Sequence, residues 1–140
     1  MSRKCYVGRR RRMTVQDWKG LGWDQEQAER YAQLDHVTAE VVVLEEDGVR
    51  PLAHHVRHSP GGFSWGYAGS GPSELARCIL LDHFDLPGGT DADSDSPRLP
   101  VSYQRFKFDV IARLDQHQPW SISSRQIDEW ALSCVQEPER

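Results

Sequence analysis

A glycine-rich segment that leads into a predicted helix is the part of the sequence whose residue types come closest to a binding chemistry. Gly66, Gly69 and Gly71 are followed by Pro72, a residue favoured in the first turn of a helix. Backbone N–H groups at such a helix start, together with the positive end of the helix dipole, would hold a phosphate or a carboxylate. The candidate anion-binding residues are therefore Gly69, Ser70, Gly71 and Ser73.

The same glycines have two other interpretations. Neither a G-x-x-x-x-G-K-[ST] loop nor a correctly spaced G-x-G-x-x-G is present, and Pro72 lacks the N–H group that an anion would use. In the interpretation that we favour, the glycines let the chain turn tightly while Phe63, Trp65 and Tyr67 pack against a sheet. In the third interpretation, this loop contacts another protein.

Metal-binding and nucleophilic chemistry are weakly supported. His54, His55 and His58 have no cysteine or second histidine pair nearby at a recognised zinc spacing, so we expect them to make ordinary hydrogen bonds. Cys78 falls inside a predicted buried helix, and no G-x-S-x-G nucleophile elbow occurs. We therefore expect no metal site, no cofactor and no catalytic residue.

An acidic stretch has part of the pattern of a calcium-binding loop. Asp91, Asp93 and Asp95 occupy alternate positions, as the first ligands of such a loop do. Ser96 and Ser102, however, stand where the loop needs a glycine and a bidentate glutamate. The stretch is better explained as a solvated acidic loop.

Charge is distributed unevenly along the chain. Residues 1–12 contain six basic and no acidic residues, whereas the other 128 residues carry a net charge of −10. This basic cluster has three interpretations: a solvated or intramolecularly paired arm, a surface that docks on an acidic protein, or a nucleic-acid contact. The candidate partner-binding residues combine the cluster with the aromatic loop and the acidic stretch, and they are Arg9, Arg10, Arg11, Arg12, Trp65, Tyr67, Asp91, Asp93 and Asp95.

Two regions have the pattern of β-structure. Alternation over residues 4–9 favours a short strand, although the arginines after it weaken this prediction. Residues 40–45 contain three consecutive valines, the pair Asp47-Gly48 has hairpin turn chemistry, and residues 49–57 resume an extended pattern. Because Pro51 has no N–H to donate, it should lie at a strand start or on an edge strand.

Capping residues and a 3.6-residue period predict four helices. The first covers residues 25–34, where Asp24 and Gln27 have capping-box spacing. The second begins at Pro72, the third covers residues 101–117, and the fourth begins at Ser123.

These elements indicate an α+β fold, with a small antiparallel sheet of about three strands covered by three to four helices. The prediction is a single domain over residues 1–135 with a basic N-terminal edge, an insertion at 13–37 and a disordered tail at 136–140. Its expected core consists of Val41, Val43, Leu75, Ile79, Leu80, Phe106, Val110, Ile111, Leu114, Trp120, Ile127 and Trp130.

Composition excludes several classes of protein. The longest apolar run, residues 78–81, is far shorter than the roughly 18 residues of a transmembrane helix, so we expect no membrane association. No apolar segment follows the basic N-terminus, which argues against a secretory signal and for a cytoplasmic protein. Three cysteines without a C-x-x-C pair fit reduced thiols.

The stretch HSPGGFSWGYAGSGP at residues 58–72, which runs on into Leu75-Ala76, resembles the signature of the family called domain of unknown function 6166. The likeness extends to YVGR at residues 6–9, YQRFK at 103–107, and Trp120 and Trp130, about three-quarters of the chain. A gap between Arg12 and about Thr38 looks like an insertion. The resemblance implies no activity, only a setting in bacteria, their phages and other mobile elements.

We therefore expect a non-enzymatic accessory protein of a phage or mobile element that acts by binding a host protein or complex. Inhibition of a host defence system is one specific version of this function. The alternative is a nucleotide-, phosphate- or nucleic-acid-binding domain that uses the helix start at 66–73 and the basic cluster at 3–12. Neither the identity of the partner nor the oligomeric state follows from the sequence.

Overall fold

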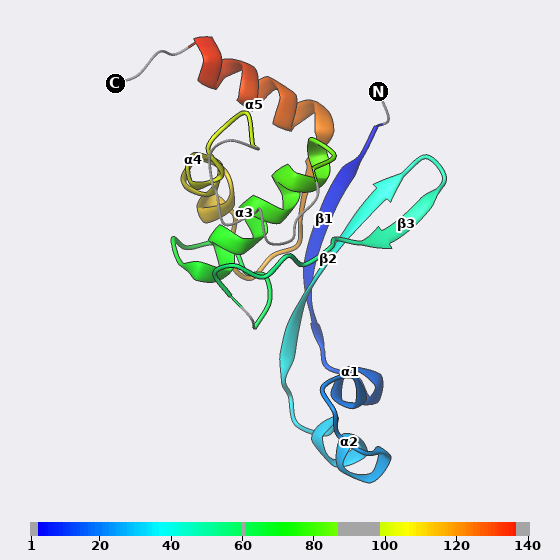
Figure 1. The fold of residues 1–140 in the computed structure, drawn as a ribbon. Coiled ribbons are helices and arrows are strands. Elements are labelled where there is room, and N and C mark those ends of the chain that lie inside the picture. Colours follow the sequence, from blue (N-terminus) through cyan, green and yellow to red (C-terminus); the bar gives the residue numbers. More distant parts are fainter. Residues whose placement is uncertain (1–2, 60, 87–98, 137–140) are drawn as a thin grey trace.

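The computed structural model describes residues 3–59, 61–86 and 99–136. Within them, one antiparallel sheet has the strand order β3-β2-β1-β4, and helices gather on one of its faces (Figure 1). The strands are β1 (Cys5–Arg12), β2 (Val37–Glu45), β3 (Gly48–Pro51) and β4 (Trp120–Ser123). The helices are α1 (Val15–Gly20), α2 (Gln25–Tyr31), α3 (Ser70–His83), α4 (Tyr103–Asp109) and α5 (Ser124–Gln136), with a 3-10 helix η2 (Ile111–Arg113).

The predicted α+β class is confirmed, but the sheet has four strands rather than about three. The additional strand is β4, which is only four residues long and pairs with Cys5–Gly8 of β1. Trp120 and Ile122 stand at alternate positions of β4, and both side chains are buried. Because its partner lies more than a hundred residues earlier in the chain, the short local pattern did not indicate this strand.

Strand β1 continues through all four arginines and pairs with β2 along its whole length. The basic cluster is therefore part of an interior strand, rather than a free arm at the end of the chain. The predicted β2–β3 hairpin is confirmed, with Gly48 at a positive φ in its turn, but β3 ends at Pro51 and does not continue to residue 57. Pro51 is the last residue of the edge strand β3, as its missing N–H group requires.

The helices that cover the sheet differ from their predicted lengths. Helix α3 begins at Ser70, two residues before the predicted start. Helix α4 covers only Tyr103–Asp109, although the prediction was a helix from residue 101 to residue 117. Beyond it, Ile111 turns into the core within η2, and its carbonyl accepts a hydrogen bond from the Gly66 N–H group. The predicted cap of α5 is confirmed, because Ser123 and Gln126 exchange hydrogen bonds.

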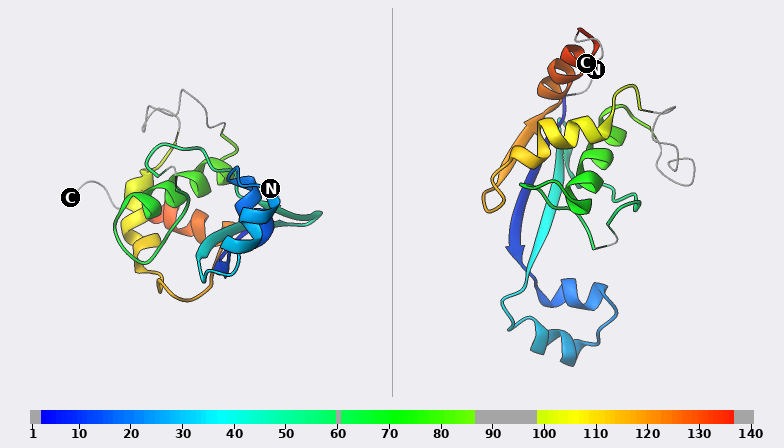
Figure 2. Two further views of the ribbon diagram at one scale, coloured as in Figure 1. Left: turned by 90° about the horizontal axis from the view of Figure 1, so that it is seen from below. Right: turned by 90° about the vertical axis from the view of Figure 1, so that its left-hand side faces the viewer.

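Helices α1 and α2 pack on each other at the far end of the β1–β2 ribbon, away from α3, α4 and α5 (Figure 2). Helix α2 was predicted, and Asp24 caps it as expected. Helix α1 was not predicted, although Thr14 and Asp17 form a capping box at its start. We call residues 13–36 the helical tip.

The core lies between the sheet and α3, where residues 71–81 are all buried. The predicted core residues are buried except for Val110, Leu114 and Trp130, which are only partly covered. The expected core did not include Tyr6, Tyr103 or Leu52, although all three are buried. Trp65 is also buried, as the favoured packing interpretation expected. The predicted tail at 136–140 lies outside the described residues except for Gln136, where α5 ends.

Gly8 allows the indole of Trp120 to lie directly on β1. A Cβ atom at residue 8 would come within 2.3 Å of ring atom Cε2 of Trp120. We expect Gly8→Ala to lower the free energy of unfolding by about 1–3 kcal/mol, because the indole must move within a packed core. Urea denaturation would measure the change.

Gly20→Ala is the matched control for this substitution, because nothing lies within 4 Å of the added carbon. Helix propensity predicts that this control is neutral or slightly stabilising. Equal losses in the two variants would show that Trp120 does not cover Gly8.

Candidate functional site

The predicted anion-binding residues lie at the start of α3, and most of them are occupied by packing. Gly71 and Ser73 are buried, and a Cβ atom on Gly71 would lie 2.7 Å from Cβ of Ser64. The Ser73 hydroxyl lies 3.4 Å from Oε1 of Gln104. The backbone N–H group of Ser73 donates to the Gly69 carbonyl over 3.0 Å. Among the four candidates, only Ser70 is exposed, and Gly69 is partly so. This geometry favours the packing interpretation.

One turn later, the buried carboxylate of Glu74 organises the chain that follows β3. It accepts hydrogen bonds from the N–H groups of Arg57 and His58 over 3.0 Å and of Ser59 over 3.2 Å. His54 Nε2 donates a fourth over 2.9 Å. Burial by itself raises the pKa of Glu74, but these four donors outweigh it, so the pKa lies below its usual value. No motif in the sequence indicated these contacts of Glu74.

Two of the three histidines, His54 and His58, make side-chain hydrogen bonds, as expected. His54 contacts Glu74, and His58 Nε2 lies 2.7 Å from the hydroxyl of Tyr103. Across the described residues, no three His, Cys, Asp or Glu side chains gather closely enough to hold a metal ion.

A hollow of about 360 Å³ brings a cysteine and a histidine together, which the sequence did not indicate. Its lining includes His55, Cys78 and Asp82. Burial raises the pKa of the Cys78 thiol to about 11, so the thiol is protonated at neutral pH. This arrangement does not activate a nucleophile.

The four arginines of β1 divide between the two faces of the sheet. Arg9 and Arg11 share the carboxylate of Glu40, with N–O distances of 2.8 and 2.9 Å. Arg11 also contacts Asp17. These contacts raise the pKa of Arg11 and lower the pKa values of Asp17 and Glu40. Arg12, which strand alternation places on the same face as Arg10, lies 3.0 Å from Asp35. Arg9, Arg11 and Arg12 are therefore all paired with carboxylates of this chain.

On the helix-covered face, Arg10 holds the glycine-rich segment. Its guanidinium lies 4.4 Å from the centre of the Trp65 ring and donates to the Ser64 hydroxyl and the Gln116 carbonyl. Trp65 was a candidate partner contact, but its side chain is completely buried between Arg10 and Trp120, so that prediction is wrong. Tyr67 remains 43% exposed. Asp91, Asp93 and Asp95 lie outside the described residues.

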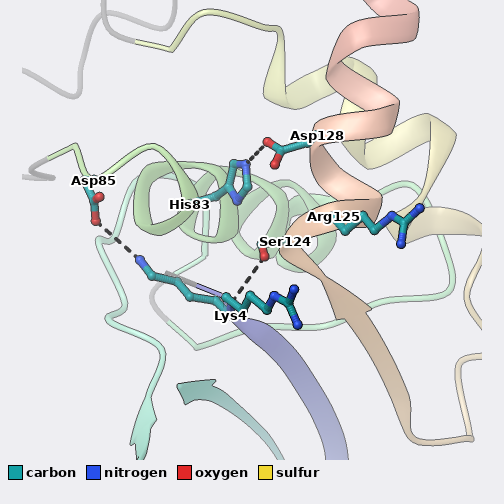
Figure 3. Close-up of a pocket in the computed structure, with 7 residues that line it drawn as sticks. Lys4, His83, Asp85, Ser124, Arg125 and Asp128 are labelled. Carbon is teal, nitrogen blue, oxygen red and sulfur yellow. Dashed lines mark hydrogen bonds and ion pairs between the residues drawn. The ribbon is translucent and has the colours of Figure 1, made fainter. Parts of the chain in front are cut away.

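A polar cavity of about 300 Å³ lies where the start of β1 meets the end of α3 and the start of α5 (Figure 3). Lys4 Nζ lies 3.3 Å from Asp85, and the Lys4 N–H group donates to the Ser124 hydroxyl. His83 Nε2 lies 2.8 Å from Asp128. Because these lining groups satisfy one another, the cavity is a charged seam between elements. Its lining residues are Arg3, Lys4, His83, Asp85, Ser124, Arg125 and Asp128.

Behind this seam, Asp82 joins α3 to two strands. Its carboxylate accepts from the Tyr6 hydroxyl over 2.7 Å, and it lies 2.8 Å from Arg50 and 3.2 Å from Lys4. Burial raises the pKa of Asp82, but the three donors together hold it below its usual value. The group therefore stabilises the junction between α3, β1 and β3.

The sheet face opposite the helices carries two rows of mostly apolar side chains. Paired residues of neighbouring strands point to the same side, and Tyr6, Val43 and Ile122 point toward the helices. The alternate positions therefore form the uncovered face (Figure 2). We call its apolar residues the open face: Cys5 and Val7 of β1, Val42 and Leu44 of β2, and Val49 and Pro51 of β3.

The helical tip also exposes apolar side chains. Leu21, Trp23 and Leu34 are 66%, 44% and 47% exposed. The Tyr31 ring lies between two indoles, with its centroid 5.1 Å from that of Trp18 and 4.8 Å from that of the partly exposed Trp23. The tip therefore has a small aromatic core of its own and an apolar outer surface.

The DUF6166 family, a family of unknown function, matches residues 27–133 of the chain, which is more than half of its length. The protein belongs to the DUF6166 family. No curated protein and no solved structure matches the chain.

The DUF6166 match begins inside α2 and ends inside α5. It therefore includes the glycine-rich segment, Glu74 and the helices that cover the sheet, whereas β1 and α1 precede it. The match does not test the prediction that residues 13–37 are an insertion in the family. In the described part of this DUF6166 chain, no helix is long and apolar enough to cross a membrane.

Proposed function

We propose that this DUF6166 protein is a non-enzymatic accessory protein of a phage or mobile element, which binds a host protein or complex through its helical tip. The observation that carries the proposal is the exposed apolar surface of the tip, held at the end of the β1–β2 ribbon away from the other helices (Figure 1). Exposed apolar residues that gather in one place mark sites of protein contact more often than scattered ones do.

The tip is held in a defined orientation on the ribbon. Arg11 of β1 donates to Asp17 of α1 over 2.9 Å and to Glu40 of β2 over 2.9 Å, so one guanidinium links all three elements. The Met13 N–H group donates to the His36 carbonyl and closes the base of the tip. A binding surface that is ordered before contact loses less conformational entropy on association.

Charge indicates what kind of partner surface fits the tip. Residues 13–36 contain five acidic and two basic residues. Asp24 caps α2, and Glu26 and Glu29 lie within it, next to the apolar surface. A host protein with an apolar groove bordered by basic residues would complement this arrangement. Inhibition of a host defence system is one version of such binding.

The internal pairing of the arginines favours protein binding over the nucleic-acid alternative. Arg9, Arg11 and Arg12 each lie within 3.0 Å of a carboxylate oxygen of this chain. A phosphate backbone would have to displace these carboxylates, which weakens the electrostatic gain on binding.

The test is affinity capture from a host lysate, followed by measurement of the affinity of the purified partner. The double variant Leu21→Ser/Leu34→Ser removes exposed apolar groups but keeps the cluster of Trp18, Tyr31 and Trp23. We expect it to weaken partner binding at least about tenfold. Leu132→Ser is the matched control, because Leu132 is 57% exposed on α5, outside the tip.

Two results would overturn the proposal. One is a partner whose affinity is unchanged in the double variant. The other is binding of labelled DNA or RNA with a steep decrease in affinity as salt rises, which would favour the nucleic-acid alternative.

A further inference from the structure

We propose that the open face is the interface of a homodimer, in which two copies of this chain stack their sheets face to face. An antiparallel sheet with one solvated face normally alternates apolar residues toward the core with polar residues toward water. Here both faces are apolar where the sheet is widest. Val49 is 65% exposed and Leu44 39% exposed on the open face. Such a pattern is typical of a sheet that is covered on both sides.

The rows of the open face continue across the sheet. Leu44 is paired with Val49 on one side and with Cys5 on the other, and Cys5 is paired with Ser123. The next row has Val42 between Pro51 and Val7, followed by Ser121. Each row therefore has three apolar members and one small serine. A surface of small and medium-sized side chains that continues across four strands can be covered more fully by the face of a second sheet than by a single helix.

Charge selects a second copy as the occupant. Arg9 of β1 lies directly opposite Glu40 of β2, beside the apolar rows and on the same face. A twofold axis along the seam between β1 and β2 places β1 of each copy over β2 of the other. Arg9 then faces Glu40 of the second copy, and Glu40 faces its Arg9. The apolar rows meet in the same arrangement, with Val7 over Val42 and Cys5 over Leu44.

The dimensions of the face set the expected strength. At about 3.3 Å per residue and 4.8 Å between strands, the 25 residues of the four strands cover roughly 400 Å² per copy. This area is below the roughly 600 Å² per copy of the smallest specific interfaces, so the dimer should be weak and should dissociate at micromolar or higher concentrations. Helices α3, α4 and α5 lie on the other side of the sheet, and α1 and α2 lie beyond its end (Figure 2).

The experiment is sedimentation equilibrium of the purified full chain across a concentration series. Wild-type protein should show a monomer–dimer equilibrium. Leu44→Lys and Val49→Lys each place a charge in the interface, and each should raise the dimer dissociation constant at least about tenfold. Leu132→Lys on α5 should leave it unchanged. Circular dichroism melting curves will show whether each variant folds. If Leu44→Lys does not fold, the test rests on Val49→Lys, because the Val49 side chain is more exposed.

A charge exchange tests the symmetry itself. Arg9→Glu and Glu40→Arg should each be monomeric, because like charges then meet across the twofold axis. Mixing the two variants should restore a heterodimer, in which each copy supplies the charge that the other needs. A wild-type chain that stays monomeric, a dimer insensitive to both lysine variants, or a mixture that does not associate would each overturn the proposal. The two lysine variants change no residue of the helical tip and none of the contacts that hold it, so this test is separate from that of the proposed function.

Discussion

Replacement of Glu74 by glutamine is expected to lower the free energy of unfolding by about 3 kcal/mol. The buried carboxylate accepts hydrogen bonds from three backbone N–H groups and His54. A glutamine has the same shape but only one acceptor oxygen, and its NH₂ group would face N–H donors. Several buried donors would then lose their partner. Urea denaturation monitored by tryptophan fluorescence would measure the loss.

Glu129→Gln is the matched control. The Glu129 side chain is 65% exposed and pairs with Arg125 four residues earlier on α5. Exposed pairs of this kind contribute little, so we expect a change below about 0.5 kcal/mol. If both glutamine variants unfold at the same urea concentration, Glu74 does not hold the chain after β3.

The same carboxylate makes stability depend on acid pH. Because the pKa of folded Glu74 lies below its usual value, its contribution is present above the pKa of the unfolded chain, about 4.3. That contribution is lost as the pH falls through the folded pKa. The wild-type free energy of unfolding should therefore decrease from about pH 5 downward. The difference between wild type and Glu74→Gln should become smaller over the same range.

Truncation of Trp65 to alanine is expected to lower the free energy of unfolding by about 3–5 kcal/mol. The indole is completely buried, packs edge-on against Trp120 with ring centroids 5.6 Å apart, and lies beneath the guanidinium of Arg10. Its removal leaves a large cavity between the glycine-rich segment and β1. Urea unfolding would measure the loss directly.

Tyr67→Ala separates a core role from a contact role, because Tyr67 lies two residues later and is 43% exposed. We expect its effect on stability to be much smaller than that of Trp65→Ala. A Trp65→Ala variant that is as stable as Tyr67→Ala would contradict the core position of Trp65.

Patterns within a few residues were predicted well, because each of them depends on a local hydrogen bond or on local backbone freedom. Asp47-Gly48 forms the expected hairpin turn, and Gly48 has the positive φ that this turn needs. Asp24 caps α2, and Ser123 with Gln126 caps α5. In each case the interacting atoms are at most three residues apart, so the pattern contains both partners.

The candidate surfaces depend on contacts between distant parts of the chain. The open face exists because β1 brings β2 and β4 to its two sides, although β4 begins at Trp120. Glu74 contacts N–H groups 15 to 17 residues earlier, which no helical period specifies. Such partners are selected by the packing of the whole chain, so a sequence pattern cannot identify them.

The basic cluster shows most clearly which properties the sequence determines and which need the tertiary structure. The sequence by itself determined that six cations lie in the first twelve residues, and therefore that the chain is polarised. Only the tertiary structure decided what they do, because a strand turns successive side chains to opposite faces. Arg10 thus packs on Trp65, whereas Arg9 and Arg11 meet Glu40 on the other side. The basic cluster is paired within the chain because the neighbouring strand β2 places Glu40 beside Arg9 and Arg11.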